Sequence, residues 1–348
     1  MMKGIRKITP YIPGKQPNFA DMIKINTNEN AFPPSPKVKE ALAHFSTNQL
    51  KLYSSLTNES LTTALAEKFQ LKPKNFLIGN GSDEVLAFCF LAFFNSDFPV
   101  LFPDITYGFY KVWGELFHIP FEEIPLDADF QIDFSDYNRK NGGIILTNPN
   151  APTGDYHTLS EMKDFLKKHS DEIVVVDEAY IDFGGESLAP LVNEFDNLIV
   201  VQTFSKAAAL AGLRVGYAVG NAELISILNA IKSSFNPYSV DILSEKLATA
   251  AVKDEEYYKK INAEICQTRE YFTEELAKLG FQTVPSKANF ILTTHPERSM
   301  KKLFEELTNQ HIFVRYFDKP QRLASFLRIT IGTREEMEVV LNAIKKLS

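Results

Sequence analysis

Three apolar runs in the middle of the chain each end in a polar turn, and this repeated pattern constrains the fold more than any other feature. The three segments are 144-IILTNPNAPTG-154, 174-VVVDEAY-180 and 198-LIVVQTFSK-206. Continuous apolar runs of this length are typical of strands that are buried on both faces of a parallel sheet. Because helical segments separate the runs, they predict an α/β fold with a mainly parallel sheet. Such sheets bind ligands at the carboxyl ends of their strands, where these turns lie.

The third turn places Lys206 directly after a strand, with Ser205 beside it and Arg214 eight positions later. A lone lysine in a loop is more often a surface residue, because lysine is rarely buried. Here Ser205 and Arg214 are suitable donors to a single phosphate group. A lysine amine reacts with carbonyl compounds. Together these residues indicate a bound aldehyde that carries a phosphate, namely pyridoxal 5'-phosphate.

The other two turns supply groups that suit the ring of this cofactor. Asp177 stands at the end of its strand, where a carboxylate could keep the pyridine nitrogen protonated. Tyr180 and Asn148 could each donate to the phenolic oxygen of the ring. Taken singly, Asp177 fits a helix cap or turn residue and Asn148 fits a turn former. The occurrence of all three motifs in one chain favours the cofactor site.

A fourth segment, 75-NFLIGNGSDEVLAF-88, predicts a strand, a glycine turn and an apolar helix. It imitates a dinucleotide-binding fingerprint, but Glu84 replaces the third glycine. We therefore interpret Gly81, Ser82 and Asp83 as a phosphate cradle, since a helix N-terminus attracts anions. Capping of the helix by Ser82 is the alternative, and it is compatible with the cradle.

Nearly the whole chain resembles the fold-type I pyridoxal-phosphate-dependent aminotransferases of class I/II, and most of all the histidinol-phosphate aminotransferases. The resemblance implies a large domain with a mainly parallel seven-stranded sheet and a small α+β C-terminal domain. It also implies a homodimer that transfers an amino group to 2-oxoglutarate, with Lys206, Asp177 and Tyr180 as the catalytic residues. The motifs that carry it are 9-TPYIPGK-15, 26-NTNENAFPPSPK-37, 79-GNGSDE-84, 102-FPDITYGFY-110, 148-NPNAPTG-154, 177-DEAY-180, 203-TFSKAAALAGLRVGY-217, 284-VPSKANFIL-292 and 327-LRITIGTREEME-338.

Four aromatic or polar residues take their predicted roles from this resemblance. Tyr107 matches the residue that stacks on the cofactor ring, although an ordinary core aromatic is the alternative. Tyr53 matches a tyrosine that reaches the cofactor phosphate of the partner subunit, but Ser54 follows it where the family has proline. Tyr11 and Asn28, in the N-terminal arm, match residues that face the substrate.

Two arginines follow or interrupt apolar runs near the C-terminus. Arg315 comes after 312-IFV-314, and Arg328 lies within 326-FLRITI-331. Arginine among apolar residues needs an anionic partner, because it cannot lose its charge. That partner is either an internal carboxylate or the substrate, and the resemblance favours the phosphate or carboxylate end of the substrate. The family has glycine near Ala209, so we expect an ordinary backbone conformation at this alanine.

The predicted domains are an arm without helix or strand at 1–35, a large cofactor-binding domain at 36–250 and a small domain at 251–348. We expect one strand over 311–316.

The net charge of −7 argues against a nucleic-acid surface. The longest apolar run, 85–94, is too short to cross a membrane.

The N-terminal segment, the cysteines and the histidines favour a cytoplasmic protein without bound metal. The N-terminus lacks the apolar segment of a signal peptide. The chain has only two cysteines, and its six histidines show no metal-ligand spacing.

Other activities on the same scaffold stay open at this point. Threonine-phosphate decarboxylases share the scaffold and both arginines, and a broad aromatic aminotransferase would also fit. A pyridoxal-phosphate-sensing regulatory domain is a more remote alternative, because the chain has no spare basic segment for DNA binding.

Overall fold

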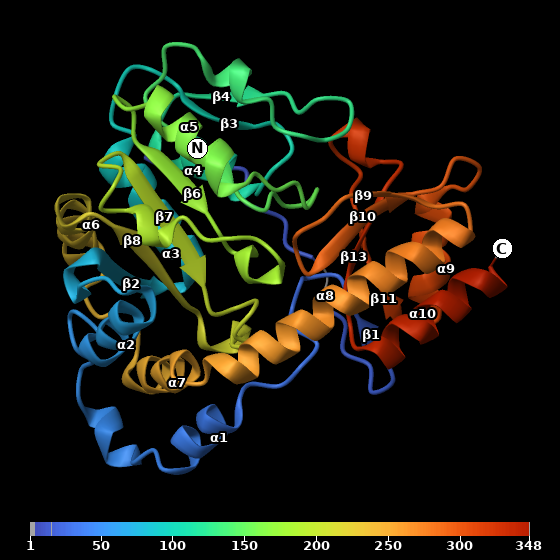
Figure 1. The fold of residues 1–348 in the computed structure, drawn as a ribbon, viewed down its shortest axis with the longest axis horizontal. Helices are drawn as coiled ribbons and strands as arrows, with labels where there is room; N and C mark the ends of the chain where they lie inside the picture. The colour runs from blue at the N-terminus through green and yellow to red at the C-terminus, as the bar shows by residue number, and fades with distance from the viewer. Residues whose placement is uncertain (1–3, 15, 348) are drawn as a thin grey trace.

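The computed structural model describes residues 4–14 and 16–347, and a seven-stranded sheet forms the centre of its larger part, on the left in Figure 1. Its strands are β2 (Phe76–Asn80), β3 (Val100–Pro103), β4 (Phe121–Ile124), β5 (Ile144–Thr147), β6 (Val174–Asp177), β7 (Leu198–Thr203) and β8 (Val215–Gly220). The order across the sheet is β2-β8-β7-β6-β5-β3-β4. β8 runs antiparallel to both neighbours, whereas the other pairs are parallel. The predicted mainly parallel sheet is therefore confirmed.

The register of the central strands brings the three polar turns to one edge. Thr147 of β5 lies opposite Asp177 of β6, which in turn lies opposite Val201 of β7. Because these strands are parallel, the turns that follow them emerge side by side. This is the arrangement that the sequence predicts for a ligand site.

Helices cover both faces of the sheet, which explains why its strands are apolar throughout (Figure 1). These helices are α2 (Glu59–Phe69), α3 (Gly81–Phe93), α4 (Phe109–Phe117), α5 (Leu159–Lys168), α6 (Ala222–Phe235) and α7 (Ile242–Val252). Val175 of β6 packs in the layer formed by α3, α4 and α6, whereas Val174 and Val176 pack in the layer formed by α2, α5 and α7. Thr158 and Glu161 form a capping box at the start of α5.

A smaller antiparallel sheet with its own hydrophobic core follows in the C-terminal part of the chain. Its strand order is β12-β13-β10-β9, with β9 (Gln282–Val284), β10 (Phe290–Thr294), β12 (Arg315–Tyr316) and β13 (Leu327–Thr330). The helices around it are α8 (Glu255–Lys278), α9 (Met300–Asn309) and α10 (Arg334–Lys346). Tyr258 near the start of α8 packs on the larger core, and Phe272 near its end packs on the smaller one. The long helix α8 thus connects the two cores.

Two predictions about strands are wrong. The single strand expected over 311–316 is divided into β11 (Ile312–Phe313) and β12, which belong to different sheets. The arm, expected to have no strand, contains β1 (Ile23–Lys24), which pairs in parallel with β11. This pairing holds the arm against the C-terminal part of the chain.

The division into 1–35, 36–250 and 251–348 stays a proposal, and residues 1–3 and 15 of the arm lie outside the described part. The arm is followed by α1 (Pro36–Ala43). Across residues 4–14 and 16–347, the helices are too short or too polar to span a bilayer.

Candidate active site

Lys206 lies in the turn after β7, and the N-terminal arm holds it at two points. Its Nζ donates a hydrogen bond to the main-chain oxygen of Thr27 at 3.2 Å and lies 5.7 Å from the centre of the Tyr180 ring. The side-chain amide of Asn30 donates to the main-chain oxygen of Lys206 at 3.0 Å. The arm therefore positions both the amine and the backbone of this lysine.

Two cavities, of about 110 Å³ and about 370 Å³, are both lined by Lys206. They share four lining residues, which are Tyr107, Ala151, Tyr180 and Lys206. The smaller cavity is also lined by five further residues predicted to bind the cofactor, namely Ser82, Asp83, Asp177, Ser205 and Arg214. The larger is lined by all four residues predicted to bind substrate, namely Tyr11, Asn28, Arg315 and Arg328.

Asp177 ends β6 and is almost fully buried, with 3% of its surface exposed. Its Oδ2 accepts a hydrogen bond from the Tyr110 hydroxyl at 3.0 Å, and its Oδ1 accepts one from the main-chain N–H of Ala179 at 3.1 Å. Burial raises the pKa of the carboxyl to about 6, and the two hydrogen bonds oppose this rise. Such a carboxylate can hold a proton on a ring nitrogen.

Arg214, Ser205 and Ser82 present anion donors to the smaller cavity. Nη1 of Arg214 lies 3.4 Å from the Ser205 hydroxyl, and its Nη2 forms an ion pair with Asp83 at 2.9 Å. The Asp83 side chain is therefore engaged with a cation. Its main-chain N–H, in the first turn of α3, remains the group that Asp83 can offer to an anion.

The close packing at the start of α3 depends on glycine. A Cβ on Gly216 of β8 would lie 2.3 Å from the main-chain nitrogen of Ser82, and Gly81 has a φ of 79°. The residue that precedes the helix is Asn80, so Ser82 is not the capping residue. Within the described ranges its hydroxyl has no hydrogen-bond partner. A guanidinium, two hydroxyls and free N–H groups fit a phosphate.

Tyr107 follows β3, and its ring forms part of the wall of both cavities. Its hydroxyl donates to Oδ1 of Asp83 at 2.6 Å, and burial raises the pKa of this hydroxyl. Tyr110 and Trp113 pack against the ring edge-on. The hydrogen bond and these contacts fix the orientation of an aromatic face beside Lys206.

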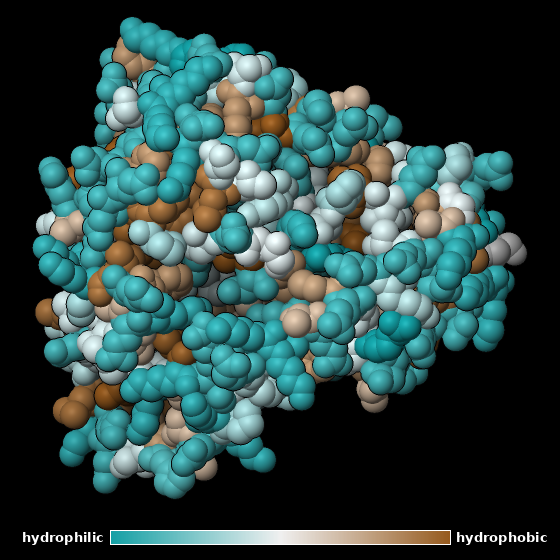
Figure 2. All heavy atoms as spheres, in the orientation of Figure 1, coloured by the Kyte–Doolittle hydropathy of each residue, from teal (hydrophilic) through white to brown (hydrophobic). Residues whose placement is uncertain are grey.

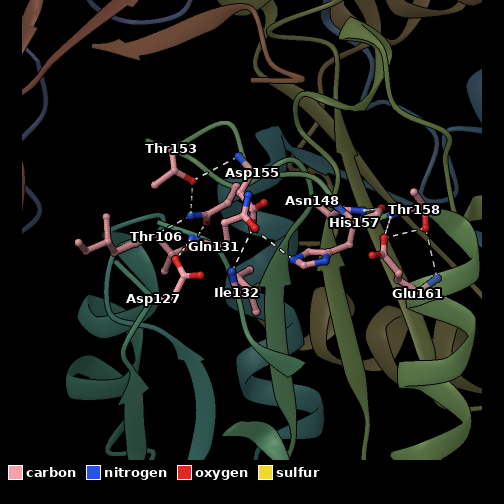
Figure 3. A network of polar contacts seen from close by, with 12 residues as sticks. Thr106, Asp127, Gln131, Ile132, Asn148, Thr153, Asp155, His157, Thr158 and Glu161 are labelled. Atoms are coloured by element: carbon pink, nitrogen blue, oxygen red, sulfur yellow. Dashed lines mark hydrogen bonds and ion pairs between the residues drawn. The ribbon is translucent and has the colours of Figure 1, made fainter. Parts of the chain in front are cut away.

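Asn148 is not at the cavity, which corrects the prediction. Its side-chain amide donates to the main-chain oxygen of His157 at 2.9 Å and accepts from the main-chain N–H of His157 at 2.8 Å (Figure 3). A buried amide is most stable where both of its ends are bonded, and the segment before α5 provides both partners. Ala151 lines both cavities instead, and its methyl group cannot donate a hydrogen bond.

Tyr180 and Asn28 connect the smaller cavity with the arm and with β13. The Tyr180 hydroxyl accepts from the Asn28 amide at 2.9 Å, so its own proton is available for a ligand. Oδ1 of Asn28 accepts from the Thr330 hydroxyl at 2.9 Å. Asn28, which is fully buried apart from 2% of its surface, is thus fixed at the boundary of the larger cavity.

Arg315 and Arg328 line the larger cavity from β12 and β13. Among the described residues, neither forms an ion pair with a carboxylate, so the internal salt bridge is not observed. Nη2 of Arg328 donates to the main-chain oxygen of Asn26 at 2.8 Å, while its buried Nε has no hydrogen-bond partner in this part of the chain. Burial lowers the pKa of Arg328, and the charge of Arg315 acts in the same direction. These cations suit an anionic ligand group.

The two remaining predicted tyrosines lie in different surroundings. The ring of Tyr11 stacks on Phe109 at 4.3 Å and lines the larger cavity. Burial raises the pKa of its hydroxyl, and the charges of Arg328 and Arg315 oppose the rise. Tyr53 is 82% exposed, stacks on Tyr238 at 4.7 Å and lies outside both cavities of its own chain. Its predicted role in a partner subunit stays a prediction.

Ala209 differs from the expectation, because its φ is 55°, in the left-handed region. Its N–H donates to the main-chain oxygen of Lys206 at 3.1 Å, which closes the turn. Alanine adopts this conformation only with strain, since its Cβ approaches the following carbonyl.

Two residues with a clear part in the site were missed from the sequence. Tyr110 contacts Asp177, and it stands three positions after Tyr107 in the segment 102-FPDITYGFY-110. Thr27 contacts Lys206 through its main-chain oxygen, a group that every residue carries. The sequence signal for Tyr110 is its spacing of three positions from Tyr107, and Thr27 has no such signal.

Comparison with known proteins gives one family and a consistent set of relatives. A family model described as aminotransferase class I and II matches residues 20–344. Relatives called histidinol-phosphate aminotransferase are 46% identical in Clostridium beijerinckii, over 98% of this chain and 95% of that one, and 47% identical in Lactococcus lactis subsp. cremoris, over 98% and 96%.

Solved structures share the fold at lower sequence identity. The histidinol-phosphate aminotransferase of Clostridium acetobutylicum has a TM-score of 0.85 at 24% identity, with 93% of this chain and 98% of that one covered. That of Sinorhizobium meliloti, in complex with pyridoxal-5'-phosphate, has a TM-score of 0.82 at 23% identity, with 93% and 91% covered. The L-threonine-O-3-phosphate decarboxylase of Porphyromonas gingivalis has a TM-score of 0.80 at 21% identity, with 93% and 98% covered.

Proposed function

Because the chain belongs to the aminotransferase class I and II family, we propose that it transfers the amino group of histidinol phosphate to 2-oxoglutarate. The products are imidazole-acetol phosphate and glutamate, and the reaction is a step of histidine biosynthesis. The cofactor is pyridoxal 5'-phosphate, and the fold is that of the fold-type I enzymes. Relatives with nearly half of their residues identical bear the name of this activity.

The observation that carries the substrate proposal is the position of Arg315 and Arg328 in the cavity of Lys206. Two neighbouring guanidinium groups can hold the phosphate of histidinol phosphate and the distal carboxylate of 2-oxoglutarate in turn. Both substrates of the reaction are anions, whereas the imidazole end needs no such partner. Tyr11 and Asn28 border the same cavity and orient the bound molecule.

The residues of the smaller cavity fit the cofactor. When bound, pyridoxal phosphate supplies an electron sink for the carbon that carries the amino group. Ser82, Ser205 and Arg214 would hold its phosphate together with the N–H groups at Gly81 and Asp83. Asp177 would hold a proton on the ring nitrogen, Tyr180 would donate to the phenolic oxygen, and the aromatic side chain of Tyr107 would pack against the ring.

Lys206 performs the proton transfer in this proposal. Its Nζ would take the proton from the substrate carbon that bears the amino group and deliver it to the carbon of the bound cofactor that receives this group, as a general base and then a general acid. The hydrogen bond to Thr27 holds the amine beside Tyr180, so that the proton is moved on one face of the substrate. Asp177 stabilises the charge that develops during this transfer.

We also propose that the enzyme is a cytoplasmic homodimer. Both cysteines are free thiols, which suits a reducing compartment. Tyr53 is exposed together with Leu50, Leu52, Leu56 and Tyr238, and hydrophobic atoms project from the corner of the molecule below α2 (Figure 2). A second copy that covers this corner would bring Tyr53 to the partner's cofactor phosphate. Sedimentation of an active monomer would contradict the dimer.

The test is a visible absorption titration of the cofactor-loaded protein with histidinol phosphate, without any keto acid. The proposal predicts that the yellow absorption falls as the amino group is transferred to the cofactor, and that 2-oxoglutarate restores it. An unchanged spectrum would reject histidinol phosphate as the donor. Release of carbon dioxide from O-phosphothreonine would then favour a decarboxylase, and a response to phenylalanine would favour an aromatic aminotransferase.

A further inference from the structure

Tyr110 is a buried residue of α4 that lines neither cavity, yet its hydroxyl contacts Asp177 at 3.0 Å. We propose that Tyr110 is a positioning residue, whose hydroxyl keeps the Asp177 carboxylate ionised and directed into the smaller cavity. The inference rests on the proposed function, in which Asp177 holds a proton on the ring nitrogen of the cofactor. Tyr110 touches no ligand there and acts only through the carboxylate.

The direction of the hydrogen bonds around Tyr110 can be derived from a neighbouring amide. The side-chain N–H₂ of Asn150 donates to the main-chain oxygen of Ile105 at 2.9 Å and to the Thr153 hydroxyl at 3.0 Å. Its Oδ1 is therefore the acceptor for the Thr106 hydroxyl, 2.8 Å away. This contact uses the single proton of Thr106.

The hydroxyl protons of Thr147 and Tyr110 can be placed once the proton of Thr106 is assigned to Asn150. Thr147 lies 2.8 Å from the Tyr110 hydroxyl and 3.1 Å from Thr106, so the shorter contact is with Tyr110. An ionised Asp177 can only accept, and Tyr110 has one proton. Tyr110 therefore donates to Asp177 while it accepts from Thr147. A donor that also accepts a hydrogen bond is polarised, which strengthens its contact with the carboxylate.

Among the charged and titratable groups around Asp177, Tyr110 has the largest effect in lowering the pKa of its carboxyl. Burial raises the pKa of the carboxyl, and among the groups that lower it the Tyr110 hydrogen bond has the largest effect, followed by the Ala179 N–H. Asp83 of α3 raises it and Lys206 lowers it through their charges. Other titratable groups that interact with it are Cys89 of α3, Tyr107 and, through Tyr110, Tyr180.

A matched pair of tyrosine substitutions tests the assignment. Tyr110→Phe removes the hydroxyl that contacts Asp177 but keeps the ring. Tyr137→Phe is the control, because Tyr137 is equally buried and its hydroxyl has no hydrogen-bond partner within the described residues. Binding of pyridoxal phosphate to the full chain is measured from pH 5 to pH 9 through the fluorescence of the single tryptophan, Trp113.

In Tyr110→Phe the carboxyl loses a charge-assisted hydrogen bond, so its pKa rises and cofactor binding weakens at a higher pH than in the unaltered protein. We expect the acid limb of the binding profile to move up by about one pH unit, with roughly tenfold weaker binding near its midpoint. Tyr137→Phe should reproduce the unaltered profile. An acid limb that does not move in Tyr110→Phe would overturn the assignment.

A second measurement separates positioning from general damage to the fold. In an Asp177→Asn background, Tyr110→Phe should cause no further loss of cofactor binding, and an equal loss in both backgrounds would overturn the assignment. An unaltered chain that binds no pyridoxal phosphate would overturn the proposed function and this inference with it. An unaltered chain that binds the cofactor and transaminates, with no effect of Tyr110→Phe, would overturn the inference alone.

Discussion

Arg315 of β12 and Arg328 of β13 stand directly opposite each other in an antiparallel pair of strands. Like charges in this position destabilise a sheet. Among the described residues no carboxylate forms an ion pair with either arginine, so no negative charge within that part of the chain offsets the repulsion. A bound anion would offset it, and we therefore attribute the pair to function rather than to folding.

Replacement of either arginine by methionine should weaken the binding of anionic substrates. Each guanidinium contributes about 1.5–3 kcal/mol through charged hydrogen bonds, so the KM for histidinol phosphate should rise roughly 10- to 100-fold. The kcat should change less, because the arginines contact the end of the substrate that does not react. Steady-state kinetics of Arg315→Met and Arg328→Met measure both quantities.

The repulsion between the two arginines gives a second readout of the same variants. Without substrate, the free energy of unfolding should stay equal or rise by up to about 1 kcal/mol in Arg315→Met, because a like-charge pair is removed. In Arg328→Met the loss of the hydrogen bond to the main-chain oxygen of Asn26 opposes this gain. Arg139→Met is a suitable control, since Arg139 pairs with Glu122 at the surface. A large loss of stability in Arg328→Met, with KM unchanged, would show that this arginine is structural.

Sequence patterns predicted the parts of the site that lie at strand ends. Lys206 and Asp177 follow apolar runs, and parallel register alone brings the ends of those runs together. Patterns did not predict contacts that depend on the path of a turn. Asn148 and Ala151 lie three residues apart in one turn, and only the folded chain shows which of them reaches the cavity. The contact between Tyr110 and Asp177 spans 67 positions and has no local signal.

Loss of the Lys206 amine should abolish turnover in Lys206→Ala. The amine moves the proton in the proposed reaction, and general acid–base groups contribute about 10²- to 10⁴-fold to the rate. The variant should still bind pyridoxal phosphate through Ser82, Ser205 and Arg214, which equilibrium dialysis can show. A variant of an exposed lysine on α9, Lys302→Ala, is the control. Full activity of Lys206→Ala would contradict the assignment.

The carboxyl of Asp177 should make the cofactor-free protein less stable as the pH rises. Its pKa is about 6 in the folded chain, above its ordinary value of 3.8, so the folded state binds more protons between these values. The stabilisation that the neutral carboxyl gives to the folded state is therefore fully present below about pH 4 and is lost above about pH 6. The loss amounts to about 3 kcal/mol, because one pKa unit corresponds to about 1.4 kcal/mol.

Comparison of the unaltered protein with Asp177→Asn isolates this contribution. Urea unfolding of the cofactor-free proteins at pH 5 and pH 7.5 measures it, and the asparagine variant should lose less stability over this range. Glu178, whose pKa burial raises to about 7, gives both proteins a further loss in the same direction. Equal pH dependence in the two proteins would show that Asp177 titrates outside this window.

The left-handed conformation of Ala209 predicts that glycine is tolerated, and even favoured, three residues after Lys206. Ala209→Gly removes the strain at a φ of 55°, which exceeds the roughly 0.4–1 kcal/mol that the added freedom of glycine costs. The free energy of unfolding should therefore rise by up to about 1 kcal/mol, with activity retained. Ala208→Gly, next to it and without a positive φ, should instead lose about 1 kcal/mol. Chemical unfolding of both variants measures the difference, and equal losses would mean that the turn holds Ala209 without strain.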